Sequence, residues 1–299
     1  MREPKDGSLE RAGVTLHYVE WPAEPPVAAE PPILLLHGLS SNSRYWDRVA
    51  VRLSGRRVIA LDQRGHGLTG RAPHAPTLPK GFAMRELVED VAFMVAKLGL
   101  DTPVVVGHSW GATVALEVVA TQPGLASGLV FIDGPVQSAS NLFSWDDAQR
   151  IMQPTLPRFA DFAAAVAESR SDFGDAWGED LEAFVKARIV PDAGDLILTL
   201  TAPARYELLK GLFQSHPDVL WPQVDVPAAV LLALRSFARI SRSTEAGVDR
   251  LGGLAAQIQI KWFDTPHDIP LFLPAEIAAE IERVAELAAA TGTSEPAAG

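Results

Sequence analysis

Short apolar runs and helical patterns alternate along most of this chain, and this alternation restricts the fold more than any other feature. Continuous apolar runs, typical of central strands covered on both faces, occur at residues 33–36, 58–61, 104–106, 129–132, 229–234 and 258–263. Residues 14–19 instead alternate apolar and polar side chains, which predicts a half-buried edge strand. This order of elements predicts an α/β fold with a parallel sheet wrapped by helices.

Three segments carry helical patterns. Apolar residues recur at spacings of three and four over residues 85–98, which predicts a helix that Gly99 ends. A second helix is expected over residues 109–121. A third is expected to begin at Pro274, because proline is tolerated in the first helical turn.

The alternation stops between residues 135 and 222, where helix formers and aromatic residues dominate. Because strand-like runs resume at Ala229, we interpret this segment as a helical cap inserted over the carboxyl ends of the strands. The core then comprises residues 1–134 and 223–299, and a plain second helical domain is the alternative. The aromatic residues of the cap suggest an apolar pocket, with Trp145, Trp177 and Phe213 as candidate substrate-binding residues. The alternative is that these rings pack the cap on itself.

Composition narrows the range of partners. The net charge of the 299-residue chain is −11, from 26 Lys and Arg against 37 Asp and Glu. Such a chain repels phosphate backbones and anionic lipids, so we expect neither nucleic-acid nor membrane binding, but a small-molecule substrate. The absence of cysteine excludes disulfides and thiolate chemistry. Residues 1–11 are polar, unlike a signal peptide, and the apolar runs are too short to span a bilayer, so we expect a cytoplasmic protein. The oligomeric state stays open.

The motif Gly-His-Ser-Trp-Gly occupies residues 107–111, between an apolar run and a predicted helix. A serine on a sharp strand-to-helix turn holds its hydroxyl above the sheet in a strained backbone conformation. The positions two before and two after it crowd the backbone, and Gly107 and Gly111 occupy them. The first amides of the helix stabilise negative charge close to the turn. Ser109 is therefore the candidate nucleophile.

A second loop fits the same chemistry. His37-Gly38-Leu39-Ser40 directly follows the apolar run 33–36. Acyl transfer needs two backbone N–H groups directed at the oxyanion that forms on the substrate. We predict that the amides of Leu39 and Trp110 supply them.

Five segments together resemble the α/β-hydrolase superfamily: LLLHGLSSNSRYW, RVIALDQRGHGLT, VVVGHSWGATVALE, LVFIDG and HDIPLFLPAEIA. They extend from about residue 33 to residue 281, and the segment 135–222 is similar only to the helical caps of the family. The resemblance implies a mostly parallel eight-stranded sheet. It also implies the chain order nucleophile, acid, histidine. It says little about the substrate.

The resemblance places the catalytic histidine after the last strand, where His267 lies between Pro266 and Pro270. His267 is expected to act as general base toward Ser109 and as general acid toward the leaving group. For the other histidines we expect structural roles. His37 and His66 are expected in loops, His108 in packing, and His17, His74 and His216 at the surface or in the cap.

The acid departs from the family's usual pattern. The family most often carries Asp or Glu a few residues after the seventh strand, but no carboxylate follows residues 228–234 until Glu245. In some relatives the acid instead follows the sixth strand, and Asp133 occupies that position here. Asp133 is the preferred candidate for the third catalytic residue. Glu245 and a triad without an acid are the alternatives.

We expect no cofactor and no metal. Residues 65–70 spell G-x-G-x-x-G after a strand, but the prolines at 73 and 76 prevent the helix that a dinucleotide site requires. The histidines also lack the close spacing of a metal site.

The most economical hypothesis is a serine hydrolase, either a carboxylesterase or a lactonase, with a small apolar substrate. An aspartate at position 109 would instead suggest a dehalogenase or an epoxide hydrolase. Perhydrolysis and carbon–carbon bond hydrolysis are known among serine-bearing relatives. A ligand-binding or signalling protein with an impaired triad is the alternative from a different class.

Overall fold

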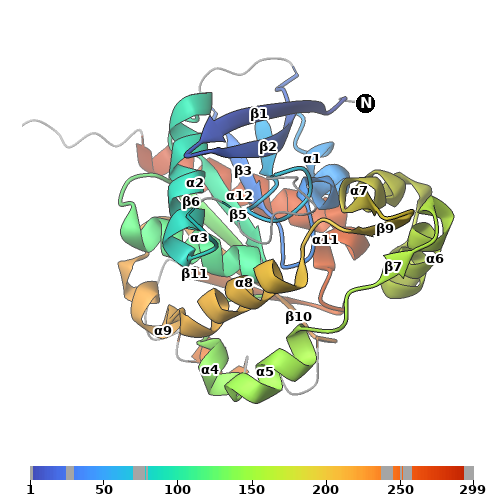
Figure 1. Ribbon diagram of the computed structural model, residues 1–299. Helices are drawn as coiled ribbons and strands as arrows, with labels where there is room; N and C mark the ends of the chain where they lie inside the picture. Colours follow the sequence, from blue (N-terminus) through green and yellow to red (C-terminus); the bar gives the residue numbers. More distant parts are fainter. Residues whose placement is uncertain are drawn as a thin grey trace, which may run out of the picture.

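The chain is described by a computed structural model that covers residues 3–24, 30–69, 78, 80–236, 245–249, 251 and 258–292. Its centre is an eight-stranded sheet with the strand order β1-β2-β4-β3-β5-β6-β10-β11 (Figure 1). The strands are β1 (Lys5–Arg11), β2 (Val14–Trp21), β3 (Ile33–Leu36), β4 (Val58–Leu61), β5 (Val104–His108), β6 (Gly128–Ile132), β10 (Ala228–Ala233) and β11 (Ile258–Phe263). From β4 to β11 neighbouring strands are parallel, which confirms the expected mostly parallel sheet.

Helices cover both faces of this sheet, and others lie between β6 and β10. They are α1 (Asp47–Ala50), α2 (Met84–Leu98), α3 (Trp110–Thr121), α4 (Ala139–Leu142), α5 (Trp145–Met152), α6 (Phe162–Phe173), α7 (Glu182–Ala187), α8 (Ala202–Gln214), α9 (Pro217–Leu220), α11 (Ile269–Phe272) and α12 (Pro274–Gly292). Short 3-10 helices are η1 (Ser43–Trp46), η2 (Gly174–Ala176), η3 (Glu179–Leu181) and η4 (Trp221–Gln223). The three predicted helices are confirmed as α2, α3 and α12, and Gly99 ends α2 with a φ of 60°.

The side chains of the strands divide the core into two layers. Leu34 and Leu36 of β3 face one layer, whereas Ile33 and Leu35 face the other, as the two-residue repeat of a strand requires. The first layer packs against α2 and α3, and the second packs against α1 and α12 (Figure 1). Burial on both faces explains why these strands are continuously apolar.

The edge of the sheet differs from the prediction. The segment 14–19 lies within β2, which pairs with both β1 and β4, so β1 forms the edge. A two-residue turn joins β1 to β2, with positive φ at Ala12 (52°) and Gly13 (81°), as hairpin turns of the primed types require. The half-exposed, polar sequence of β1 carries little apolar periodicity, which is why it was not predicted as a strand.

The segment between β6 and β10 is not purely helical. Besides α4 to α9 it contains a small antiparallel sheet of β7 (Arg158–Phe159), β9 (Asp195–Leu198) and β8 (Ile189–Asp192). A tight turn with positive φ at Ala193 (50°) and Gly194 (95°) joins β8 to β9. In Figure 1, α4 and α5 lie at the bottom of the view, and the small sheet lies at the right beside α6 and α7.

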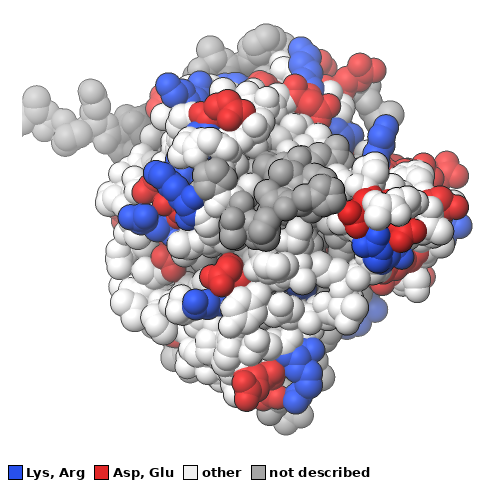
Figure 2. Space-filling view, viewed as in Figure 1, with Lys and Arg blue, Asp and Glu red and all other residues white. Residues whose placement is uncertain are grey.

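The surface bears charges of both signs. On the face shown in Figure 2, acidic and basic side chains are interspersed, and uncharged atoms predominate over the region of α8. Within the part of the chain that the structure describes, no helix combines the length and the apolar character that crossing a bilayer demands.

The packing of α12 on the sheet predicts a large difference between two substitutions on this helix. Ile281 is fully buried against the second core layer, whereas Leu287 is 45% exposed. Ile281→Ala should lower the free energy of unfolding by about 2–5 kcal/mol, because it removes buried methyl groups and leaves a cavity. Leu287→Ala, the matched control, should change it by about 0.5 kcal/mol or less. Urea denaturation measures both, and equal losses would contradict this packing.

Candidate active site

Ser109 lies at the tip of the turn between β5 and α3, with φ 54° and ψ −119°. This backbone conformation is strained for a residue with a side chain, and such strain clusters at functional sites. A Cβ atom at Gly107 would overlap the backbone of Gly111, and one at Gly111 would overlap the carbonyl oxygens of Leu36 and His37. The two glycines therefore let the turn pack against β3 with no room for a side chain.

The amides predicted to bind the oxyanion flank this turn. Trp110 is the first residue of α3, so its N–H has no acceptor within the helix and lies at the positive end of the helix dipole. A Cβ atom at Gly38 would come within 3.3 Å of Ser109 Cβ, so the loop that carries Leu39 passes directly beside the serine. The two chain segments that bear the predicted donors thus meet at Ser109.

His267 and Asp133 form a short hydrogen bond. His267 follows β11, Asp133 follows β6, and the imidazole Nδ1 donates to Asp133 Oδ2 at 2.5 Å. The other carboxylate oxygen, Oδ1, accepts from the Ala233 amide at 3.1 Å, and Oδ2 also accepts from the Ser236 hydroxyl at 2.9 Å. Because Nδ1 carries the proton, Nε2 of neutral His267 is free to accept one.

The pair shifts the pKa values of both groups. Burial lowers the pKa of His267, but the hydrogen bond and charge of Asp133 outweigh burial and raise it above the ordinary histidine value. Burial raises the pKa of Asp133, but its hydrogen bonds and the His267 charge hold it below the ordinary aspartate value. The contribution of His267 to stability is lost as pH rises through its folded pKa, and that of Asp133 is lost as pH falls through its own. The pair therefore stabilises the fold most between these two limits.

One cavity is lined by four of the five residues predicted for catalysis and the oxyanion hole, and Leu39 is not among its lining residues. Ser109, Trp110, Asp133 and His267 all line a pocket of about 300 Å³. Glu245, the alternative acid, is exposed on a helical segment, and the Nδ1 proton of His267 goes to Asp133 instead. The carboxylate partner of His267 in this structure is thus the one after the sixth strand of the superfamily's order.

The wall of this pocket is mostly apolar. It is formed by the loop after β6, by α4, α5, α8 and α9, and by β10, through Pro135, Val136, Ala139, Leu142, Phe143, Ile151, Met152, Leu212, Pro217 and Leu232. Thr113 and Gln137 add uncharged polar groups. No Lys or Arg belongs to the described lining, and Asp133 is its one carboxylate.

The three aromatic residues predicted to bind substrate are not among the lining residues of the Ser109 pocket. The Trp145 ring packs against Phe213 with centroids 5.3 Å apart and against Tyr206 at 5.7 Å, which joins α5 to α8. Trp177 packs on the second core layer beneath Arg170. None of the three lines the Ser109 pocket, so they hold the α4–α8 region together, as the packing alternative proposed.

The histidines other than His267 differ from one another. His108 is buried, stacks on Tyr45 and contacts the main-chain oxygen of His267 through Nε2 at 3.1 Å, which fits its expected packing role. His17 was predicted at the surface, which is wrong, because it is buried in β2. There it hydrogen-bonds Asp62 at 2.8 Å. His216 is exposed, and His74 lies outside the described residues.

Sequence reasoning missed the groups that support the pair. Ser236 follows β10, where the family most often carries its acid, and its hydroxyl donates to the Asp133 carboxylate. Tyr45 donates its hydroxyl to Asp268 Oδ1 at 3.1 Å, next to His267. Ser236 could have been predicted from its position soon after the seventh strand of the superfamily's order. Nothing local in the sequence links Tyr45 to Asp268.

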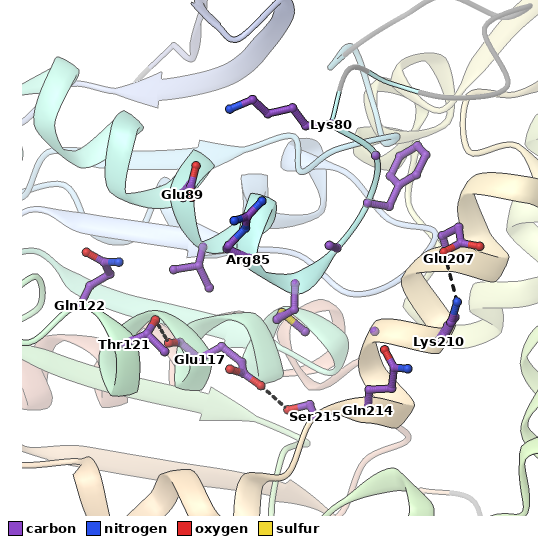
Figure 3. Close-up of a pocket in the computed structure, with 16 residues that line it drawn as sticks. Lys80, Arg85, Glu89, Glu117, Thr121, Gln122, Glu207, Lys210, Gln214 and Ser215 are labelled. Carbon is purple, nitrogen blue, oxygen red and sulfur yellow. Dashed lines mark hydrogen bonds and ion pairs between the residues drawn. The ribbon is translucent and has the colours of Figure 1, made fainter.

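A second cavity of about 730 Å³ opens between α2, α3 and α8 (Figure 3). Its charged side chains interact with near neighbours. The Ser215 hydroxyl donates to Glu117 Oε1 at 2.6 Å, and Lys210 lies 4.0 Å from Glu207. Both signs of charge are mixed along this groove, which is typical of a solvated seam between helices.

The chain is similar in sequence to known hydrolases. A lipase of Mycobacterium tuberculosis, LipV, is 28% identical over 257 residues, which span 83% of this chain and 91% of LipV. Epoxide hydrolase B of the same species is 34% identical over 125 residues, but the match covers 41% of this chain and only 33% of that protein. The chain thus aligns with about a third of the length of that curated relative.

Solved structures show the same fold. The crystal structure of E-2-(acetamidomethylene)succinate hydrolase superposes with a TM-score of 0.78 at 21% identity, over 95% of this chain and 100% of that one. The sequence profile of the alpha/beta hydrolase fold matches residues 31–182. This match includes the turn of Ser109 and the loop of Leu39. The chain therefore belongs to the alpha/beta hydrolase fold family.

Proposed function

We propose that this hydrolase cleaves carboxylic esters or lactones through an acyl-enzyme formed on Ser109. The observation that carries the proposal is the 2.5 Å hydrogen bond between His267 Nδ1 and Asp133 Oδ2, in a pocket that Ser109 also lines. A nucleophile, a base and an orienting acid on separate loops are the elements of serine hydrolysis. The similarity to a lipase over most of both chains supports the same chemistry.

In the acylation step, His267 Nε2 takes the proton of the Ser109 hydroxyl while its oxygen attacks the ester carbonyl carbon. The resulting oxyanion accepts hydrogen bonds from the Leu39 and Trp110 amides. When the tetrahedral intermediate collapses, the bond to the alkoxy group breaks and His267 returns the proton to the leaving alcohol. The acyl group is then esterified to Ser109.

In the deacylation step, water takes the place of the alcohol. His267 removes a proton from this water, and the oxygen attacks the acyl carbon. Collapse of the second intermediate returns the proton to Ser109 and releases the carboxylic acid. Asp133 stays ionised throughout and stabilises the imidazolium that forms in each step. Ser236 and the Ala233 amide keep the carboxylate oriented toward Nδ1.

The pocket favours a small, neutral and apolar substrate. Its volume of about 300 Å³ lies at the lower end of the range for ligand pockets, which suits a small ligand. Among the described residues of the lining, a carboxylate on the substrate would lie between apolar walls near Asp133 and would meet no Lys or Arg, which is costly.

Two other chemistries fit less well. Because position 109 is serine, the carboxylate attack expected of an epoxide hydrolase has no nucleophile at this turn, despite the partial similarity to such an enzyme. The ligand-binding alternative was motivated by the missing acid after the seventh strand. The contact between Asp133 and His267 supplies a carboxylate partner for the histidine, so the missing acid no longer favours that alternative.

Replacing the nucleophile gives the first test. Ser109→Ala should lower kcat for an activated ester such as p-nitrophenyl butyrate by about 10⁴-fold or more, because no acyl-enzyme forms. Ser127→Ala is the matched control. Ser127 lies at the amino-terminal end of β6, away from Ser109, and its hydroxyl donates to the Thr102 carbonyl oxygen. Comparable turnover by Ser109→Ala and wild type would refute the assignment.

Asp133→Asn tests the acid. The neutral amide removes the charge that raises the His267 pKa, so the imidazole should titrate at lower pH in NMR spectra. The acid limb of kcat/KM should follow to lower pH, because only neutral His267 accepts a proton. In addition, kcat should fall by about 10⁴-fold. Glu245→Gln should leave all three quantities unchanged, and an effect of Glu245→Gln instead of Asp133→Asn would reverse the choice of acid.

The pocket wall predicts how chain-length preference changes. Phe143→Ala removes a ring from the lining and should move the optimum in a series of p-nitrophenyl esters toward longer acyl chains. Phe213→Ala removes a ring that packs on Trp145 and should reduce stability while leaving the optimum in place. If Phe213→Ala shifts the optimum and Phe143→Ala does not, the pocket is assigned wrongly.

A further inference from the structure

Two loops meet behind the predicted oxyanion donors. The first carries residues 37–40 after β3, and the second carries residues 63–66 after β4. The Gln63 amide donates to His37 Nε2 at 3.1 Å, and the Gln63 side chain donates to the His37 carbonyl oxygen at 2.7 Å. These bonds secure the start of the first loop but do not reach the residue that follows Leu39.

A hydrogen bond to His66 does reach the residue that follows Leu39. The Ser40 amide donates to His66 Nε2 at 3.1 Å, and His66 Nδ1 donates to the Arg64 carbonyl oxygen at 2.9 Å. Because a carbonyl oxygen only accepts, Nδ1 must carry the proton and Nε2 must be the acceptor. The imidazole is 1% exposed, and burial together with the nearby His37 lowers its pKa to about 3. It therefore stays a neutral acceptor throughout the range in which His267 titrates.

The ring of His66 also contacts the second donor residue. Its centroid lies 5.3 Å from the Trp110 ring at an interplanar angle of 31°, and 4.9 Å from the His37 ring. Ser40 has a φ of 69°, a left-handed conformation that is uncommon for a residue with a side chain. One buried side chain thus holds the peptide after Leu39 and packs against Trp110.

From this geometry we propose that His66 is a positioning residue of the oxyanion hole, which sets the Leu39 loop and Trp110 relative to each other. The inference rests on the proposed function, in which the Leu39 and Trp110 amides bind the oxyanion. His66 does not contact substrate. Its effect is to keep two donors at fixed positions before the negative charge develops, which is the condition under which such donors accelerate acyl transfer.

The decisive variants are His66→Phe and His66→Gln. Phenylalanine keeps a ring beside Trp110 but offers the Ser40 amide no acceptor, whereas the glutamine Oε1 atom can accept in place of Nε2. Loss of one oxyanion donor costs about 10²–10³-fold in kcat, so a donor that is present but misplaced should cost about 10–100-fold. For His66→Phe we expect this loss in kcat with KM within about twofold of wild type, and for His66→Gln at least partial recovery.

The affinity for a boronic acid distinguishes a positioning role of His66 from a merely structural one. An aryl boronic acid forms a tetrahedral adduct that uses the oxyanion hole, so its inhibition constant should rise with His66→Phe about as much as kcat falls. The pH midpoint of kcat/KM should not change, because His66 does not titrate there. His17→Phe is the matched control, because it removes another buried histidine whose side-chain bonds go to Asp62 and Asp6. It should lower the melting temperature and leave boronate affinity unchanged.

Amide hydrogen exchange at Ser40, followed by NMR, reports on the bond without any turnover. We expect exchange at least tenfold faster in His66→Phe than in wild type, and slow exchange retained in His66→Gln. Folded His66→Phe protein with wild-type exchange, kcat and boronate affinity would overturn the proposal. If wild type hydrolyses no ester and a fluorophosphonate leaves Ser109 unlabelled, the proposed function fails. The exchange result then still decides whether His66 holds the loop.

Discussion

The hydrogen bond between His267 and Asp133 joins loops that lie 134 residues apart in the chain, and the proposed chemistry depends on it. The sheet makes this bond possible. Because β6, β10 and β11 are parallel neighbours, the residues that follow them lie together at the carboxyl ends of the strands. The turn of Ser109, which follows β5, lies at the same ends of the strands. Strand order thus places base and acid together, and burial in the pocket makes the charge of Asp133 effective on the imidazole.

Much of the fold was predictable because its central strands are covered on both faces. Continuous apolar runs identify β3, β4, β5 and β6 without ambiguity. The elements that were missed have weak periodicity. β1 is polar and half-exposed, and β8 and β9 are four-residue strands that depend on a turn at Ala193 and Gly194. Such strands are specified by their pairing partners more than by their own residues.

The site divides in the same way. Ser109, His267 and Asp133 could be named as candidates from the sequence, because the geometry of the serine turn and the family's chain order restrict where a nucleophile, a base and an acid are expected. The pocket wall was not, since Trp145 and Phe213 face each other and neighbouring side chains face the cavity. Which side of a short helix faces a cavity is decided by packing among α4, α5 and α8. Composition does not record that choice, and a buried acceptor such as His66 leaves no local signature either.

The most direct measurement is the second-order rate constant for modification of Ser109 by a fluorophosphonate as a function of pH, with the labelled residue identified by mass spectrometry. The reaction requires the same proton transfer to His267 as an ester does. We predict that the rate constant falls on acidification along a single titration curve. The midpoint of that curve should equal the pKa of the His267 imidazole measured by NMR. A rate that is independent of pH, or a label on another residue, would contradict the roles proposed for Ser109 and His267.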